Sequence, residues 1–215
     1  LAPLVLDGQG PGDSAFGGKF AELSGLSLEG RLEFVAGGNV LAAYTGPVLF
    51  THFGLSGPAA MNISRHIARH RQACPKDDPG HLRLALPGFT SPASADAWLK
   101  ERVSDGARMN LLSALKTLLP SRMAEVYLEG QANPRLSELG RKQRTDIARD
   151  LGEGFRFAVK GDRGYSFAEA TAGGVELGEV NWRTMESRRV PGLFLCGEVL
   201  DVDGYTGGFN LQAAF

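Results

Sequence analysis

The alternation of hydrophobic and polar residues near the start of the chain predicts short β-strands separated by glycine. Residues 26–29 and 32–34 alternate apolar and polar side chains, which is typical of half-buried strands. Gly30 between them is expected to mark a turn or bulge. The glycine pair at 37–38 predicts a tight connection to a further strand at 40–44. The chain therefore begins as a β-rich unit.

The next unit has the order strand, glycine-containing loop, helix. An apolar run predicts a strand at 48–51, a loop is expected at 52–57, and Pro58 holds the position that proline favours at a helix start. Ile63 and Ile67 lie four residues apart and share one face of that helix. Backbone N–H groups at such a helix start can contact an anion or a cofactor edge. The alternative is a purely structural turn.

From residue 91 to residue 151 the hydrophobic period becomes that of amphipathic helices. Four short helices joined by brief links predict a small helical bundle inserted in the β-rich unit. Gly152 is expected to follow the last helix as its C′ glycine. The apolar positions that define these helices are Trp98, Leu99, Val103, Leu111, Leu112, Leu115, Leu118, Leu119, Met123, Val126, Tyr127, Ile147 and Leu151.

Strand patterns return after the helices, at 155–160, 167–171 and 175–180. Strands on both sides of a helical insertion usually belong to one sheet or barrel around a shared core. We therefore expect an α+β fold with a β-barrel-like insert domain. Its predicted parts are a first β-rich part at 1–90, the helical bundle at 91–151, a second β-rich part at 152–181, and a C-terminal segment at 182–215.

Composition narrows the class of protein. The 215 residues carry 23 Lys and Arg against 24 Asp and Glu, a net charge of −1, so no charge field favours nucleic acid or an anionic membrane. Two distant cysteines, Cys74 and Cys196, are expected to be reduced thiols, with Cys196 buried in a strand. No apolar run reaches the roughly 18 residues of a membrane-spanning helix. We expect a soluble, cytoplasmic protein.

Glycine is abundant, with 29 residues, about twice the usual share. Residues 7–19 hold several of them and predict a surface loop. A phosphate-binding turn is not expected there, because Pro11 interrupts the segment and no apolar helix follows it.

Residues 184–215 carry the candidate chemistry. The apolar run Leu193–Cys196 predicts a strand buried on both faces of a parallel sheet. An acidic residue directly after such a strand lies at the sheet edge where ligands bind, and its carboxylate can accept hydrogen bonds from sugar-alcohol hydroxyls. Adjacent glycines allow close approach to a flat ligand, and a helix is expected to start directly after them. The candidate cofactor-binding residues are Gly197, Glu198, Asp203, Gly207, Gly208, Phe209, Asn210 and Leu211.

A calcium site at Asp201 and Asp203 is not expected, because the spaced oxygen ligands and closing glutamate of an EF-hand loop are absent from this part of the sequence. No other metal site is predicted.

Two long motifs resemble a known family. Residues 167–215 contain ATAGGVELGEV and TMESRRVPGLFLCGEVLDVDGYTGGFNLQAAF, and residues 49–65 read LFTHFGLSGPAAMNISR. Both are similar to signatures of the BaiN-like (aminoacetone oxidase family) FAD-dependent oxidoreductases. Such proteins have an FAD-binding Rossmann-like domain interrupted by an insert of a β-barrel and a helical bundle.

The resemblance implies roles for individual residues. Glu198, after Gly197, would bind the FAD ribitol, and the turn Gly207–Asn210 would lie along the pyrimidine edge of the flavin. The loop with His52 and Ser56 would lie near the junction of insert and cofactor. His52, the histidine of this glycine-framed loop, is a candidate catalytic residue, with a purely structural role as the alternative, and no catalytic acid or base is assigned. The implied reaction is electron transfer between FAD and a small organic substrate, with NAD(P)H as the reductant.

The chain departs from the family at both ends. It lacks the family's N-terminal G-x-G-x-x-G motif and most of the final helix after Phe215, so we expect a fragment made of the insert and one cofactor-edge segment. The alternative to a flavoenzyme fragment is a binding or interaction module without catalysis. Binding of added FAD distinguishes the two hypotheses.

Overall fold

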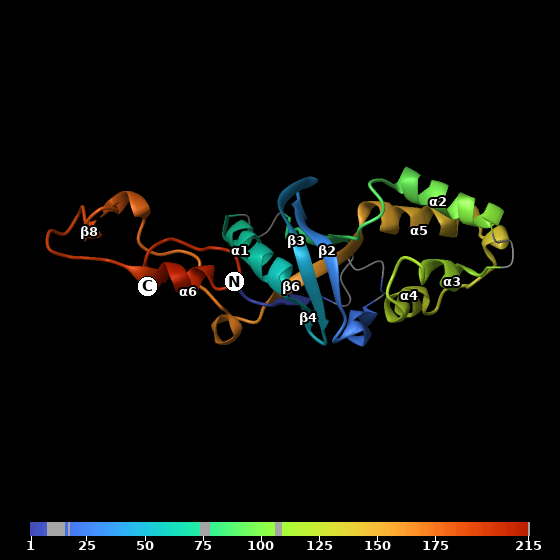
Figure 1. Ribbon diagram of the computed structural model, residues 1–215, viewed down its shortest axis with the longest axis horizontal. Coiled ribbons are helices and arrows are strands. Elements are labelled where there is room, and N and C mark those ends of the chain that lie inside the picture. Colours follow the sequence, from blue (N-terminus) through green and yellow to red (C-terminus); the bar gives the residue numbers. More distant parts are fainter. Residues whose placement is uncertain (8–15, 17, 74–77, 106–108, 215) are drawn as a thin grey trace.

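The computed structural model describes most of the chain, namely residues 1–7, 16, 18–73, 78–105 and 109–214. Its parts lie in a row, with a barrel of strands in the middle, four helices at one end and the C-terminal residues at the other (Figure 1). The accessible surface is 11776 Å², whereas a compact chain of this mass exposes about 9,600 Å². The excess agrees with the elongated arrangement.

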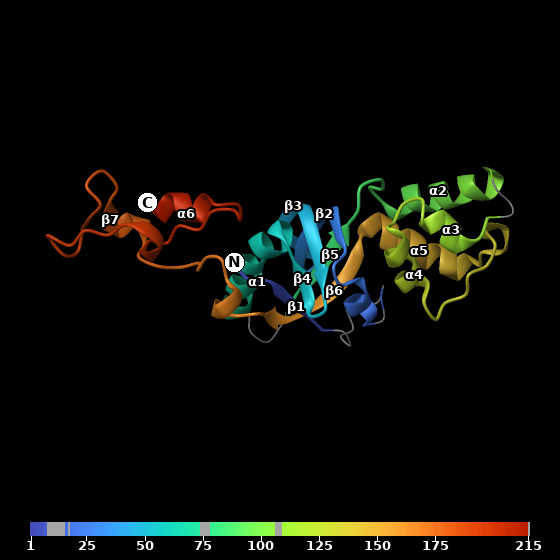
Figure 2. The ribbon, with the colours of Figure 1, turned by 60° about the horizontal axis from the view of Figure 1, so that its bottom comes forward.

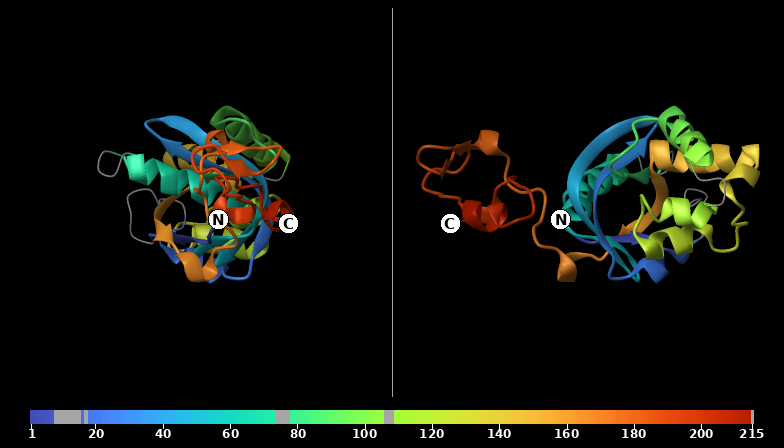
Figure 3. Two further views of the ribbon diagram at one scale, coloured as in Figure 1. Left: turned by 90° about the vertical axis from the view of Figure 1, so that its left-hand side faces the viewer. Right: turned by 45° about the vertical axis from the view of Figure 1, so that its right-hand side comes forward.

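Six antiparallel strands close into a barrel in the order β1-β4-β3-β2-β5-β6 (Figure 3). Five of these strands precede the four helices at the end of the molecule. After those helices the chain returns to form β6, which pairs with both β5 and β1. Strands on either side of the helices therefore share one sheet, and the predicted mixture of α and β structure is confirmed. The bounds are β1 (Leu4–Leu6), β2 (Ser27–Ala36), β3 (Asn39–Thr51), β4 (Gly54–Ser56), β5 (His81–Ala85) and β6 (Phe155–Asp162).

The barrel core consists of large side chains that alternate along the strands and have almost no exposed surface. Phe16 adds to this core, with its ring centroid 5.2 Å from that of Phe155 and 5.7 Å from that of Phe157. The rest of the predicted surface loop at 7–19 lies mostly outside the described residues. The principal core residues are Leu4, Leu32, Phe34, Phe50, Leu55, Leu82, Leu84, Phe155 and Phe157.

Gly30 lies inside β2, which continues through it, so the predicted turn or bulge is wrong. A Cβ at this position would lie 2.6 Å from Cδ1 of Leu84 on the neighbouring strand β5. Gly30 therefore makes room for a core side chain. The predicted connection at 37–38 is confirmed, because both glycines have positive φ angles, 57° and 75°, and β2 pairs with β3 directly across them.

Helix α1 (Pro58–Ala73) begins at Pro58 as predicted and packs on the barrel through buried Ile63 and Ile67 (Figure 2). The loop predicted before it is wrong in part, because β4 lies within it and pairs with both β1 and β3. A Cβ on Gly54 would lie under 3.0 Å from the backbone of Leu4. The glycine therefore permits the approach of β1.

The helical part contains the four predicted helices, with bounds that differ from the expectation at two points. The leucine stripe does not form one helix, because α3 ends at Leu115 and a turn carries Leu118 and Leu119. Gly154, with φ 104°, caps the last helix, while Gly152 lies inside it. Helix α2 packs on α5, where Nε of Arg144 lies 2.8 Å from the Asp96 carboxylate. The bounds are α2 (Pro92–Asp105), α3 (Leu111–Leu115), α4 (Ser121–Leu128) and α5 (Arg141–Glu153).

The C-terminal residues contain little regular structure. The strands predicted at 167–171 and 175–180 are therefore wrong, except for Val180, which lies in a short strand, and an isolated parallel bridge of Val175 to Leu200. Two short strands, β7 (Val180–Asn181) and β8 (Glu186–Ser187), pair with each other. The buried strand predicted at Leu193–Cys196 is also wrong, because Phe194 makes only an isolated bridge to Glu186 and is exposed. The Leu193 carbonyl accepts a hydrogen bond from the Ser187 N–H, and the Leu195 N–H donates to the Met185 carbonyl. The run therefore pairs with β8 over a short stretch, and this pairing leaves Phe194 exposed.

Candidate functional site

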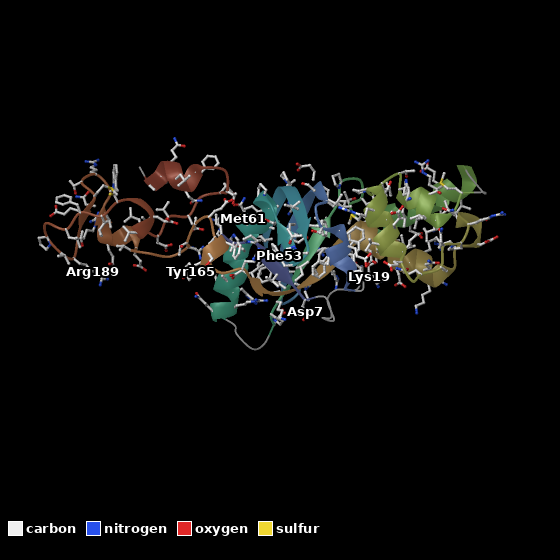
Figure 4. The ribbon with its side chains drawn as sticks, turned by 90° about the horizontal axis from the view of Figure 1, so that it is seen from below. Asp7, Lys19, Phe53, Met61, Tyr165 and Arg189 are labelled. Atoms are coloured by element: carbon white, nitrogen blue, oxygen red, sulfur yellow. The ribbon has the colours of Figure 1, made fainter. Side chains whose placement is uncertain are left out.

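The candidate segment, residues 197–211, meets the barrel at helix α1. Met61 lies on α1 where the helix faces the C-terminal residues, and Arg189 lies at their far end (Figure 4). The candidate segment contacts the barrel side mainly through residues 201–206, which lie against α1 and β3. The site therefore combines two stretches of sequence that are far apart in the chain.

Glu198 lies exposed in a single 3₁₀ turn, Gly197–Val199. Its Oε1 accepts a hydrogen bond from the backbone N–H of Thr171 at 2.9 Å, which fixes the carboxylate on one side. Glu198 and Gly197 line a hollow of about 40 Å³ together with Asn210 and Ala214. Ligand pockets are usually several hundred Å³. The hollow that the described residues form here is therefore too small to enclose a drug-sized ligand or a cofactor ring system by itself.

The glycine turn is closed by its own hydrogen bonds. Oδ1 of Asn210 accepts from the backbone N–H of Gly204 at 2.7 Å, and Nδ2 of Asn210 donates to the Gly204 carbonyl at 3.3 Å. Gly207 and Gly208 have φ angles of 128° and 92°, which other residues rarely adopt. A Cβ on Gly208 would meet no atom within 4 Å, so one side of the turn is open.

The predicted helix after the turn is confirmed as α6 (Phe209–Ala214), which is only six residues long. Phe209 and Leu211 on this helix are exposed. The structure therefore brings Gly197, Glu198 and Asn210 together, and the open turn carries two apolar side chains beside them.

Asp203 is held by arginines of α1. Its Oδ2 lies 2.5 Å from Nη1 of Arg65, and its Oδ1 lies 3.3 Å from Nη2 of Arg69. Both carboxylate oxygens therefore have partners on the barrel side. The expectation that Asp203 contacts a cofactor stays a prediction.

Arg65 connects this ion pair to Tyr44 on β3. Its Nη2 donates to the Tyr44 hydroxyl at 2.9 Å. Burial alone would lower the pKa of Arg65, but the hydrogen bonds with Tyr44 and Asp203 outweigh that effect and raise it. The guanidinium is therefore a permanent charge at this junction.

His66 is the second partner of Tyr44, with Nε2 at 2.9 Å from the hydroxyl oxygen. Burial, and then the nearby charges of Arg65 and Arg69, lower the pKa of His66. The imidazole is therefore neutral at pH 7. Because Arg65 donates to the Tyr44 oxygen, the Tyr44 hydroxyl hydrogen is available for an unprotonated Nε2.

The structure separates other candidates from this site. His52 is exposed in the turn between β3 and β4, with its ring centroid 5.1 Å from that of Phe53, and no hydrogen bond joins it to the candidate segment in the described part of the chain. Ser56 ends β4. Cys196 is exposed, which corrects the expectation of a buried strand residue. Cys74 lies outside the described residues.

Sequence reasoning missed Asn62, Arg65, Tyr44 and His66. Asn62 and Arg65 lie inside the motif at 49–65, and Asn62 is a polar residue on the buried side of α1. A buried polar side chain needs a hydrogen-bond partner, so Asn62 could have indicated a contact with another part of the chain. Nothing in the sequence indicates that its partner is the backbone N–H of Thr206, at 2.7 Å.

A family model now gives the class of protein. The HI0933-like protein Rossmann domain matches residues 16–215. The chain therefore belongs to this family, and the resemblance inferred from its two motifs is confirmed.

Individual relatives cover nearly all of this chain. The ribosomal RNA dihydrouridine synthase of Escherichia coli (strain K12) is 33% identical over 232 residues, which cover 96% of this chain and 55% of the relative. The Haemophilus influenzae protein of the same name is 30% identical over 90% of this chain and 44% of its own length. The 3-dehydro-bile acid delta(4,6)-reductase of Clostridium scindens is 31% identical over 91% of this chain and 48% of the relative. The chain thus spans about half the length of these curated relatives.

Two expectations about partners and location stay predictions. Two relatives are named for ribosomal RNA, so the expected absence of a nucleic-acid partner is open to test. Among the helices of the described ranges, none has the length and hydrophobicity needed to cross a membrane. The expected cytoplasmic location is not tested by this finding.

Proposed function

We propose that this chain is part of a flavoprotein oxidoreductase in which residues 197–211 form one edge of an FAD site. The observation that carries the proposal is the exposed Glu198 carboxylate beside Asn210 and an open glycine turn, in a chain of the HI0933-like Rossmann family. When bound, FAD supplies the electron and hydride transfer, while the protein binds and orients it.

The proposed roles follow from the side chains. Glu198 has one oxygen bonded to Thr171, and its second oxygen would accept hydrogen bonds from ribitol hydroxyls. Gly207 and Gly208 would allow the backbone to lie close to the flavin ring. Gly197, Asn210 and the exposed side chains of Phe209 and Leu211 would complete this edge.

The distribution of exposed apolar residues supports a larger site than this chain contains. Of the exposed large hydrophobic residues in the described ranges, all but Val40 and Leu41 lie between residues 165 and 211. A concentration of exposed apolar side chains in one part of a chain is typical of a surface that another part of a protein covers. We propose that these residues pack against the half of the protein that this chain does not span, and that the barrel and helices are an insert in its FAD-binding domain.

The proposed substrate is a small organic molecule and the proposed reductant NAD(P)H. The names of the relatives, a reductase and a synthase of dihydrouridine, support reductive chemistry. Ribosomal RNA is a second candidate substrate because of the 33% identity to the synthase. Incubation of the reduced full-length gene product with ribosomal RNA, followed by measurement of dihydrouridine, tests that candidate directly.

The role of Glu198 is tested by FAD titration of Glu198→Ala in the full-length gene product, with flavin fluorescence as the signal. We expect FAD affinity to fall by at least about tenfold, equivalent to about 1.4 kcal/mol, with the melting temperature unchanged. Glu176→Ala is the matched control, because Glu176 is also exposed in the C-terminal residues. Equal affinities for both variants would contradict the assignment. If no form binds FAD, the interaction-module alternative replaces the flavoenzyme.

A further inference from the structure

Two sequence motifs that lie far apart in the chain meet at one polar junction, formed by Asn62 and Arg65 of α1 with residues 203–206. We infer that Arg65, assisted by Asn62, is a positioning residue that holds the glycine turn 203–210 in one conformation for the cofactor. The inference rests on the proposed function only in the last step, the effect on cofactor binding.

The first support is the number of separate contacts to one short stretch. Nη1 of Arg65 donates to the backbone carbonyl of Asp203 at 2.8 Å and also lies 2.5 Å from its Oδ2. Bonds to both the main chain and the side chain fix the position and the rotation of this residue. Three residues later, the N–H of Thr206 donates to Oδ1 of Asn62 at 2.7 Å. Asn62, Arg65 and Arg69 lie on one face of α1, so the helix anchors the turn at two points.

The second support is burial. The side chains of Arg65 and Asp203 are only 12% and 9% exposed. The Arg65 guanidinium also lies 5.9 Å from the centroid of the Tyr44 ring and 5.8 Å from that of Tyr205, within the range of cation–π attraction. The pair therefore differs from a surface ion pair, which contributes little. Removing Arg65 would leave the Asp203 carboxylate paired with Arg69, whose side chain is half exposed and lies farther away, at 3.3 Å.

The third support is the placement of the free part of the turn. The anchors at Asp203 and Thr206 flank Gly204, whose N–H is bonded to Asn210. Gly207 and Gly208, the residues proposed to approach the flavin, lie directly beyond the second anchor. Glycine-rich segments lose much conformational entropy when ordered. Anchoring the turn before the cofactor arrives removes part of that cost from binding.

The test measures amide hydrogen exchange of the full-length gene product, with FAD affinity as a second readout. Arg65→Met keeps an apolar stem and removes the charge and hydrogen bonds. Arg65 does not bond the amides of Thr206 or Gly204 directly, so faster exchange at these two positions reports the loss of the anchored conformation. We expect at least a tenfold acceleration there, no change in the barrel strands, and at least a tenfold loss of FAD affinity.

Two further variants keep the test decisive. Arg141→Met is the control, because it removes an exposed arginine of α5, and it should change neither readout. Arg65→Lys keeps the charge without the planar fork. Its FAD affinity should lie between those of the wild type and Arg65→Met. If Arg65→Met does not fold, Arg65→Lys takes its place in both measurements.

The outcomes separate this inference from the proposed function. Unchanged exchange at Thr206 and Gly204 in Arg65→Met overturns the inference, and so does accelerated exchange with wild-type FAD affinity. Accelerated exchange in a protein that binds no FAD in any form supports the anchoring by Arg65 and overturns the flavin proposal instead.

Discussion

Gly152 lies inside helix α5, where alanine is normally the better residue, yet Gly152→Ala should destabilise this protein. In a helix interior, replacing glycine with alanine ordinarily gains about 1 kcal/mol. Here the new Cβ would lie under 3.0 Å from backbone atoms of Ser91 and Pro92 at the start of α2. Backbone atoms cannot rotate away as a flexible side chain can. The two helices would therefore have to move apart.

The expected loss follows from two opposing effects. Inserting a methyl group into a close-packed contact costs about 1–3 kcal/mol, and a clash with backbone belongs at the upper end of this range. The helix-propensity gain offsets about 1 kcal/mol, which leaves a net loss of about 2 kcal/mol in the free energy of unfolding. For a chain of this length, that loss lowers Tm by about 4–8 °C.

Urea unfolding and thermal melting, both followed by circular dichroism, measure this loss. Gly140→Ala is the matched control, because Gly140 precedes the same helix and a Cβ there would meet nothing within 4 Å. The control should change stability by less than about 1 kcal/mol. A Gly152→Ala variant as stable as the wild type, or more stable, would refute the argument that the close approach of α2 requires this glycine.

Two predictions concern pH. Burial opposes ionisation of Glu33, but hydrogen bonds from Arg31 and Arg83 outweigh it and lower its pKa. Glu33→Gln should therefore lose about 2 kcal/mol of unfolding free energy at pH 7. In chemical denaturation, the stability difference between wild type and Glu33→Gln should shrink as the pH falls below 4.5. Burial raises the pKa of Asp150, which accepts a hydrogen bond from Tyr127 at 3.0 Å. The wild type should therefore gain stability relative to Asp150→Asn as the pH falls from 7 towards 4. A stability difference between the two proteins that does not change with pH would contradict the buried position of this carboxyl.

Structure that depends on neighbouring residues in the chain could be predicted from the sequence. The glycine pair at 37–38 could make its turn without any distant contact, and Pro58 could begin a helix for reasons within its own segment. The helical period between 91 and 151 likewise predicted four helices at nearly the right places. Each of these signals acts over a few residues.

Features that depend on contacts between distant residues could not be predicted from the sequence. Gly30, Gly54 and Gly152 are glycines because a neighbouring strand or helix approaches them, and a single sequence does not reveal which element that is. The apolar run at 193–196 had the pattern of a buried strand, but burial requires neighbours that cover its faces. In the described residues the run pairs briefly with β8 and stays largely exposed. In the same way, the charges of Arg65 and Asp203 do not indicate that they pair across 138 positions.

The central claim, that this chain forms part of a flavin site, is tested most directly by the visible absorption spectrum of the full-length gene product as purified. We predict the absorption bands of bound flavin in the protein peak after gel filtration, weakened or absent in Glu198→Ala and unchanged in Glu176→Ala. A folded, colourless protein that takes up no added FAD would contradict the account.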